Sequence, residues 1–257
     1  MSTTRTELLL AFDLLLAPER FKDYGPNGLQ VEGRTEIRKI VSGVTASRAL
    51  IEAAIRAEAD ALFVHHGLFW RGQDGRVTGW MKQRLALVLG HDLNLFAYHL
   101  PLDAHPELGN NAQLGLRLGW APDAGRDGRF GEQELGFIGG RADGQSYDDA
   151  ATLAGEVERG LARAVTLIEG DGRPLRRIAW CTGGAQSYFE GAIAAGADAF
   201  VTGEISEPQA HLARETGVAY LACGHHATER FGAPAAAAHV AERLGIVHQF
   251  IDINNPA

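Results

Sequence analysis

The sequence predicts an α/β fold with two α/β domains, each made of layered sheet and helices. Short runs of apolar and β-branched residues recur along the chain, and longer stretches with helical spacing separate them. This alternation is typical of sheets that carry helices on their faces. With 257 residues, of which 46% are hydrophobic and 22% charged, the chain can bury the cores of one large or two modest domains.

The first half of the chain is expected to contain three main strands separated by helices. An amphipathic N-terminal helix and the turn-rich segment DYGPNGLQ precede them, and Ser47 is expected to cap a helix that ends near residue 59. The expected strands are 40–44, 61–64 and 95–99. The other expected elements are a helix at 80–89, a loop LPLDAHPELG at 100–109, and a helix from Asn110 or Asn111 to about Gly119.

The second half repeats this pattern after a segment that is typical of a linker. Residues 121–129 contain Pro, Gly and alternating charges, so we expect the domains to be 1–125 and 126–245. As an alternative, the first domain also includes the terminal strand within residues 246–257. The expected strands are 137–140, 178–182, 198–202, 219–223 and 248–252. The expected helices are at about 148–163, after Gly184, at 207–215, and in the Ala-rich stretch that follows.

Composition and charge restrict the expected location and partners. The net charge of −8 disfavours binding to nucleic acid or an anionic membrane by bulk electrostatics. The early apolar stretch LLLAFDLLL is interrupted by Asp13 and preceded by Glu7, so we predict neither a signal peptide nor a membrane span, and expect a cytoplasmic protein. Cys181 and Cys223 lie in apolar strand-like runs and are interpreted as buried thiols.

Side chains that can bind a metal follow three of the predicted strands, in the motifs VHHG, YHLPLD and CGHHATE. Ligands of open α/β sheets bind at the carboxyl ends of the strands, so these side chains are expected at ligand-binding edges. Imidazole and carboxylate ligands together suit divalent ions such as zinc, iron, manganese or nickel. The candidate ligands are His65, His66, Asp103, His225 and Glu229.

The spacing of these residues favours two metal ions over one. His225 and Glu229 are four residues apart and share one face of a helical turn. Adjacent side chains on an extended backbone point in different directions, so His65 and His66 can more easily serve two ions, and a carboxylate can bridge the pair. Two-metal hydrolases hold their ions about 3.5–4 Å apart with about this number of ligands. The sequence therefore predicts a dinuclear site of catalytic type.

Other histidines leave alternatives open, since a His pair at a strand end can also satisfy a turn. Three lie beside the proposed ligands, and outer-sphere and substrate roles both fit them: His99, His105 and His226. Four others are interpreted as solvated or core-edge side chains without carboxylate partners at ligand spacing: His91, His211, His239 and His248.

Two glycine-rich segments are interpreted as turns. The segment DYGPNGLQ contains Gly25, Pro26, Asn27 and Gly28, which explain a turn without any ligand. The segment TGGAQ at 182–186 follows a predicted strand, and a tight strand-to-helix turn explains its glycines better than an anion-binding loop does.

The sequence resembles the NIF-three-like dinuclear-metal-centre hexameric proteins, which are often labelled GTP cyclohydrolase 1 type 2 homologues. The resemblance covers nearly the whole chain, through DYGPNGLQVEG, VHHGLFW, HLPLDAHPELGNNAQLGLRLG, CTGGAQSY, VTGE and GHHATER to FIDINNPA. It implies two α/β domains with two metal ions between them, assembled as a toroidal homohexamer. It places the family's five ligands on the same five residues and implies that Glu229 bridges the ions. Where many members carry further histidines, this chain reads TGEISEPQAH.

Two classes of function follow from these observations. The first is a dinuclear metal-dependent hydrolase that acts on a nucleotide or related small molecule, and the resemblance implies a GTP cyclohydrolase type of reaction. The second is a non-catalytic metal-binding ring or scaffold protein. Whether the chain is an enzyme stays open at this stage. Candidates for proton transfer are Tyr98, His99, Glu204 and His226.

Overall fold

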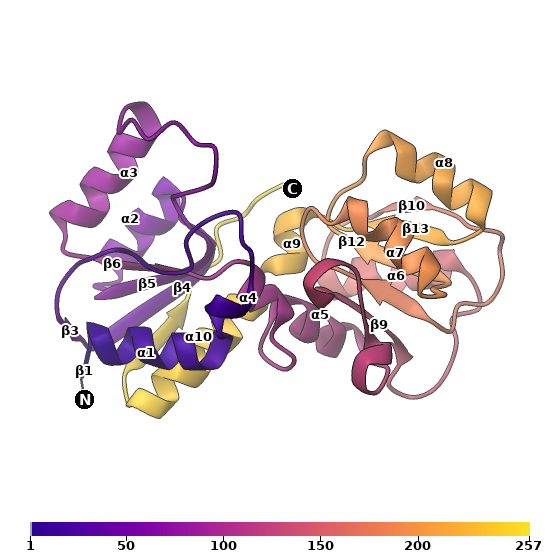
Figure 1. Ribbon diagram of the computed structural model, residues 1–257, viewed down its shortest axis with the longest axis horizontal. Coiled ribbons are helices and arrows are strands. Elements are labelled where there is room, and N and C mark those ends of the chain that lie inside the picture. Colours follow the sequence, from indigo (N-terminus) through magenta and orange to yellow (C-terminus); the bar gives the residue numbers. More distant parts are fainter. Residues whose placement is uncertain (1) are drawn as a thin grey trace. The chain divides into compact units, whose positions relative to one another are not determined.

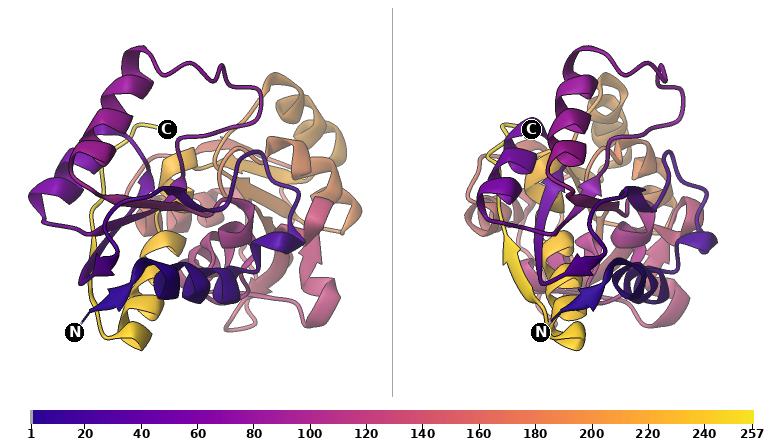
Figure 2. Two further views of the ribbon diagram at one scale, coloured as in Figure 1. Left: turned by 60° about the vertical axis from the view of Figure 1, so that its left-hand side comes forward. Right: turned by 90° about the vertical axis from the view of Figure 1, so that its left-hand side faces the viewer.

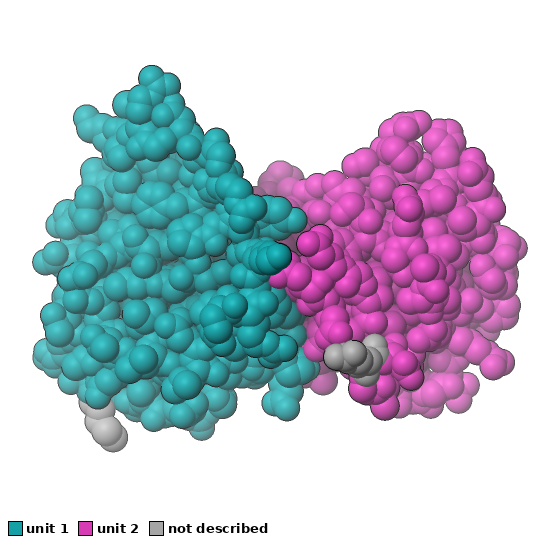
Figure 3. All heavy atoms as spheres, in the orientation of Figure 1, with its two compact units in different colours: residues 1–109, 232–254 teal, residues 110–231, 255–257 magenta. Residues whose placement is uncertain are grey.

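A computed structural model describes residues 2–257, with Arg126 described by its backbone alone, and divides the chain into two compact units. Unit 1 comprises residues 1–109 and 232–254, and unit 2 comprises residues 110–231 and 255–257 (Figure 3). Each unit contains its own sheet with helices on it, which confirms the predicted α/β class. The chain therefore forms most of unit 1, then most of unit 2, returns to complete unit 1, and ends with residues 255–257 in unit 2.

The division between the units falls at residues 109–110, ahead of the expected linker at 121–129. That segment instead contributes β7 (Trp120–Pro122) and β8 (Arg129–Phe130) to unit 2, with the short helix η2 (Gly125–Gly128) between them. Both strands pair antiparallel with β9 (Gly136–Arg141). The Pro and Gly residues therefore form a tight connection between two strands of one sheet. Such a connection has the same composition as a linker between domains.

Unit 1 is built on a five-stranded sheet in the order β14-β4-β5-β6-β2. Four of its strands are parallel: β14 (Val247–Phe250), β4 (Lys39–Thr45), β5 (Ala61–His66) and β6 (Asn94–Ala97). The strands predicted in these four places are confirmed. The fifth, β2 (Gly28–Val31), pairs antiparallel with β6, although its first residues were expected to form only a turn. Strands β1 (Thr3–Thr4) and β3 (Glu36–Ile37) form a separate small pair.

Alternate residues of β5 enter two different hydrophobic cores of unit 1. Ala61 and Phe63 pack with α1 (Arg5–Leu16) and α10 (Gly232–Leu244), whereas Leu62 and Val64 pack with α2 (Arg48–Arg56) and α3 (Gly79–Gly90). The two helix pairs cover opposite faces of the sheet (Figures 1 and 2). A strand buried on both faces is apolar along its whole length, as the sequence ALFV is. The predicted cap of α2 is confirmed, since Ser47 Oγ accepts a hydrogen bond from the Leu50 N–H.

Unit 2 is built on a sheet in the order β10-β13-β12-β11-β9-β7, with β8 beside β9. Its centre consists of three parallel strands that were all predicted: β11 (Ile178–Trp180), β12 (Ala199–Thr202) and β13 (Ala219–Ala222). Its antiparallel edge strand β10 (Thr166–Ile168) was not predicted. The helices of this unit are α5 (Asn110–Leu118), α6 (Ala150–Leu161), α7 (Phe189–Ala194), α8 (Glu207–Thr216) and α9 (His225–Glu229).

The core of unit 2 also divides between the two faces of its sheet. Trp180 packs with apolar residues of α5 and α6 on one face. On the other face, Phe200 stacks on Phe189 of α7 with ring centroids 5.8 Å apart, and Tyr220 meets both rings edge-on. Among residues 2–257, no helix combines the length and apolar composition needed to cross a membrane.

The stacked pair Phe12 and Phe63 allows a test of the first core. Both rings are fully buried, and their centroids lie 4.4 Å apart. We predict that Phe63→Ala lowers the free energy of unfolding by about 3–5 kcal/mol, because it leaves a cavity at the centre of the sheet. Urea denaturation followed by circular dichroism measures this loss. The control Leu14→Ala removes a side chain that is 79% exposed, and a change beyond about 0.5 kcal/mol there would contradict the assignment of the core.

Candidate metal centre

In each unit, the candidate ligands lie at the carboxyl ends of parallel strands. In unit 1, His65 and His66 end β5, and β6 is followed by His99 and by the short helix α4 (Leu100–Ala104), which carries Asp103. Helix α4 replaces the first half of the loop expected at 100–109. In unit 2, β13 is followed by α9, which begins at His225 and ends at Glu229. The sheet direction therefore collects the polar groups of each unit at one edge.

The imidazole of His65 is held in a defined orientation in the interior of unit 1. The residue is fully buried, and its Nδ1 lies 3.1 Å from the backbone oxygen of Tyr98. A carbonyl oxygen only accepts hydrogen bonds, so Nδ1 carries the proton and Nε2 of the neutral ring carries the lone pair. That Nε2 lies 3.5 Å from Oδ1 of Asp103. A nitrogen lone pair and a carboxylate at this distance are chemically suited to a shared cation.

His66, at the same strand end, contacts the strand on the other side of β5. Its Nδ1 lies 3.1 Å from Oγ1 of Thr45 on the neighbouring strand β4. The His65 and His66 rings face the same region, with centroids 4.4 Å apart and planes inclined by 43°. The divergence expected for adjacent side chains is therefore modest for these two rings.

A carboxylate that the sequence did not reveal holds a third imidazole in unit 1. His99 Nδ1 lies 2.7 Å from Oδ1 of Asp23, whose Oδ2 accepts hydrogen bonds from Asn27 Nδ2 and the Leu100 N–H. Burial raises the pKa of Asp23, but the hydrogen bond from His99 and these further bonds outweigh it and bring the pKa below its usual value. The segment DYGPNGLQ, interpreted as a turn, therefore supplies a carboxylate that fixes His99.

The three imidazoles of unit 1 lie close enough together that they could hold a metal ion. One ring nitrogen from each of His65, His66 and His99 lies within 4.8 Å of those of the other two. Tyr98, another candidate for proton transfer, points elsewhere. Its hydroxyl donates a 2.6 Å hydrogen bond to Asp13 of α1, and burial raises its pKa. Only the backbone oxygen of Tyr98 serves the imidazole group.

In unit 2, His225 lies between two carboxylates. Its Nδ1 is 2.6 Å from Oε1 of Glu204, and its Nε2 is 3.2 Å from Oε2 of Glu229. Partial burial of the ring lowers the pKa of His225, but the hydrogen bonds and charges of the two carboxylates raise it to about 9. Glu204 follows β12, and its Oε2 also accepts a hydrogen bond of 3.4 Å from Nε2 of Gln186. The carboxylate of Glu204 thus orients the ring of a candidate ligand from its outer side.

The TGGAQ turn forms the wall against which Glu229 lies. Gly183 has φ +72°, and a Cβ atom there would collide with the carboxylate of Glu229, which is 2% exposed. The Gly183 N–H donates to Oγ1 of Thr228, and the Thr182 N–H donates to Oδ1 of Asn111. The interpretation of this segment as a tight turn is correct, and its glycine makes room for a proposed ligand.

Four further histidines have contacts outside the candidate metal centre. His91 Nδ1 meets the backbone oxygen of Leu87, and His248 meets Oγ of Ser42. His105 Nδ1 accepts backbone N–H groups of the turn that follows it. The expectation that His211 lacks a carboxylate partner was wrong. Its Nε2 pairs with Glu207, one helical turn earlier, at 2.9 Å, but both side chains are well exposed and form a surface pair.

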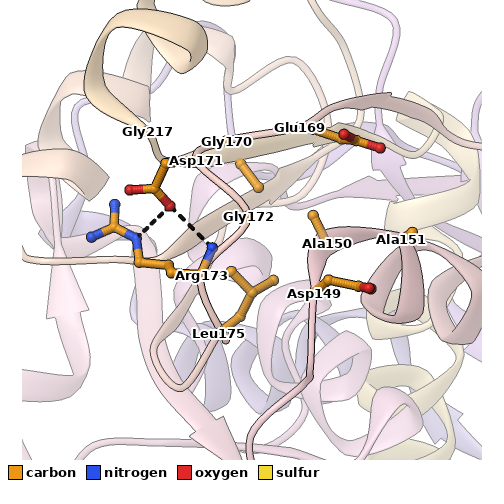
Figure 4. Close-up of a pocket in the computed structure, with 11 residues that line it drawn as sticks. Asp149, Ala150, Ala151, Glu169, Gly170, Asp171, Gly172, Arg173, Leu175 and Gly217 are labelled. Carbon is orange, nitrogen blue, oxygen red and sulfur yellow. Dashed lines mark hydrogen bonds and ion pairs between the residues drawn. The ribbon is translucent and has the colours of Figure 1, made fainter.

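A well-defined cavity in unit 2 lies away from these residues. It has a volume of about 270 Å³ and is bordered by the start of α6 and the amino end of β13 (Figure 4). Two of its acidic groups are engaged in local structure: Asp149 caps α6 through the Thr152 N–H, and Asp171 pairs with Arg173. None of the predicted ligands borders this cavity. It lies at the edge of the sheet opposite the carboxyl ends that carry the candidate metal ligands.

Comparison with known proteins gives matches over nearly the full length. The family model for Duf34/NIF3 (NGG1p interacting factor 3) matches residues 3–256. A protein from Neisseria meningitidis serogroup B named GTP cyclohydrolase 1 type 2 homolog is 53% identical over 237 residues, which are 92% of each chain. A protein of the same name from Pseudomonas aeruginosa is 47% identical over the full length of both chains.

Solved structures agree with this result. The structure described as protein ybgI, of unknown function, superposes with a TM-score of 0.93 and 43% identity, covering 99% of this chain and 100% of the other. A protein from Thermus thermophilus superposes with a TM-score of 0.87 and 32% identity at the same coverage. The fold and the sequence motifs therefore lead to the same group of proteins.

The close approach of Gly183 to Glu229 can be tested by substitution. We predict that Gly183→Ala lowers the free energy of unfolding by about 1–2 kcal/mol through its positive φ, and by about a further 1–3 kcal/mol through the forced displacement of Glu229. The matched control is Gly144→Ala, at φ +75° with no atom near its Cβ position, which carries the backbone cost alone. Equal losses for the two variants in chemical denaturation would refute the proposed wall.

Proposed function

This chain belongs to the Duf34/NIF3 family, and we propose that it is a dinuclear metal-dependent hydrolase that acts on a nucleotide or a related small molecule. The observation that carries the proposal is that side chains able to bind a metal gather in both units. Each unit presents imidazole and carboxylate groups at the carboxyl ends of its parallel strands, and the outer nitrogens of these rings are held by other groups. Such outer contacts are typical of histidines that bind metals.

We propose that two divalent ions are held by five residues of this chain. The chemistry of the set supports zinc, iron, manganese or nickel, because it combines neutral nitrogen donors with carboxylates. Within unit 1, His65 Nε2 and Asp103 lie close enough to share an ion, and within unit 2 His225 and Glu229 do. The family resemblance supports Glu229 as the bridging ligand. The five residues are His65, His66, Asp103, His225 and Glu229.

The proposed chemistry divides between the ions and the chain. Bound ions of this type lower the pKa of water and polarise the bond that is attacked. The chain's own residues orient the donors: Glu204 holds Nδ1 of His225, and the Gly183 turn leaves space for the carboxylate of Glu229. Because the pKa of His225 is raised to about 9 in the absence of metal, an ion that binds its Nε2 must displace a proton near neutral pH.

The names of the relatives support a GTP cyclohydrolase type of reaction as the first substrate hypothesis. Such a reaction would add water to the purine of GTP, open its five-membered ring and release formate. A metal-dependent hydrolase of other nucleotides or phosphoesters uses the same ligand set. A screen of metal-loaded protein should therefore include GTP, other nucleotides and simple phosphoesters.

We predict that the purified protein binds about two divalent ions per chain and that chelation abolishes turnover. Glu229→Gln and His65→Ala should each lose at least one ion, measured by elemental analysis, and lose turnover with it. His91→Ala, at an exposed histidine with a backbone contact, is the control and should keep both ions. If fully loaded wild-type protein turns over nothing that the ligand variants do not, the hydrolase proposal fails and the metal-binding scaffold remains.

We also propose that the protein works in the cytoplasm as a homohexamer, an assembly that the family resemblance supports. Light scattering of the wild-type protein should give a mass six times the 27.6 kDa of one chain. The double variant His65→Ala, Glu229→Ala should keep this mass if the ions serve catalysis alone. A fall to smaller species in the double variant would favour a structural role for the metals, and a monomeric wild type would contradict the proposed assembly.

A further inference from the structure

We propose that Tyr24, Trp70 and Arg71 form a substrate-recognition site in unit 1, in which the two aromatic rings pack against a nucleobase and the guanidinium of Arg71 binds a phosphate. This inference rests on the proposed hydrolase and deepens it, because it selects nucleotides over simple phosphoesters as the substrate class. None of the three residues is a proposed metal ligand. They lie in two loops whose sequences, DYGPNGLQ and VHHGLFWRG, had been explained only by a turn and by metal ligands.

The loop before β2 and the loop after β5 lie against each other. The Arg71 N–H donates a 2.6 Å hydrogen bond to the backbone oxygen of Tyr24, and Arg71 Nη2 donates one of the same length to the backbone oxygen of Asp23. Gly25 permits this approach, because a Cβ atom there would collide with the backbone oxygen of Phe69. The contact between the loops therefore fixes the points at which their side chains leave the backbone.

The rings of Tyr24 and Trp70 both lie next to His99. The Tyr24 and His99 ring centroids are 6.0 Å apart, and the Trp70 and His99 centroids are 5.0 Å apart, with the planes inclined by 65° and 90°. The Trp70 ring also lies 5.9 Å from the ring of His66, a candidate metal ligand. Both aromatic rings therefore stand beside the imidazole group of unit 1, where the proposed hydrolase would hold its substrate.

The Tyr24 ring is available to a ligand, because the residue is 59% exposed although it borders this group of buried and half-buried side chains. Among residues 2–257, the Tyr24 hydroxyl and Nε1 of the half-buried Trp70 have no hydrogen-bond partner. Every nucleobase has a π face that can stack on such a ring, and aromatic side chains are the usual platforms for bases in proteins. An exposed ring beside a candidate metal centre is therefore suited to the planar part of a nucleotide.

Arg71 supplies a positive charge next to these rings. The residue is exposed, and its guanidinium has no carboxylate partner among the described side chains, whereas Arg76 in the same loop pairs with Asp74. Only Nη2 of Arg71 is engaged, by the backbone oxygen of Asp23. The remaining N–H groups form a planar fork, which suits the oxygens of a phosphate. A nucleotide can therefore contact the rings and the guanidinium together, whereas a simple phosphoester can use only the guanidinium.

The test titrates the full chain, freed of metal by a chelator, with guanosine, GTP and inorganic tripolyphosphate in a calorimeter. Tyr24→Ala should weaken the binding of guanosine and GTP about 5–150-fold, the usual effect of losing a stacked ring, and leave tripolyphosphate unchanged. Arg71→Gln should weaken GTP and tripolyphosphate about 10–100-fold and leave guanosine unchanged. Tyr24→Phe keeps the ring and should restore guanosine binding. The control Trp80→Ala removes an aromatic side chain of similar exposure, 56%, from α3 and should change none of the three affinities.

The outcomes separate this inference from the proposed function. Elemental analysis should find as many ions in Tyr24→Ala and Arg71→Gln as in the wild type, because neither change removes a proposed ligand. If both variants turn over nucleotides with the KM of the wild type, or if the wild type binds neither guanosine nor GTP with or without zinc, the inference fails and a hydrolase of phosphoesters can still stand. If the wild type turns over no substrate but binds guanosine through Tyr24, the proposed function fails and the recognition site stands.

Discussion

The direction of the parallel strands is the constraint on which both candidate ligand sets depend. In a parallel sheet every strand ends at the same edge, so side chains that follow separate strands are brought together without any contact between them in sequence. In unit 1, β5 and β6 deliver His65, His66 and His99 in this way, and in unit 2, β12 and β13 deliver Glu204 and His225. The apolar strands themselves are buried on both faces, so the ligand edge rests on a rigid base.

The second requirement is a defined partner for one nitrogen of each imidazole ring. An imidazole has two nitrogens, and only a defined partner for one of them decides which way the other faces. The chain uses three different partners in unit 1: a backbone carbonyl, a threonine hydroxyl and a carboxylate. It uses a carboxylate again for His225. These partners differ in basicity, so the rings are not equivalent as ligands even before a metal is bound.

The sequence alone predicts those features that rest on local pattern. The strands around His65 and His225 are short apolar runs, and the Ser47 cap is a local signal, so all were found. Helix α4 was missed because it is only five residues long, and so short a helix has no periodic pattern that the sequence can show. Asp23 was missed because 76 residues separate it from His99, a pairing that no local pattern encodes. The place of the unit boundary likewise depends on long-range contacts across residues 110–231.

The return of the chain to unit 1 has a consequence for how the protein is made. Strand β14 pairs with β4, and α10 covers one face of the same sheet, yet both follow unit 2 in the sequence. While a ribosome synthesises residues 110–231, β4 is an open edge and the apolar face beneath α10 is exposed to water. Open edges and exposed apolar faces are the usual starting points of aggregation. The sheet of unit 2 is formed by one continuous stretch and can be complete on the nascent chain first, whereas the sheet of unit 1 closes only when its last strand arrives.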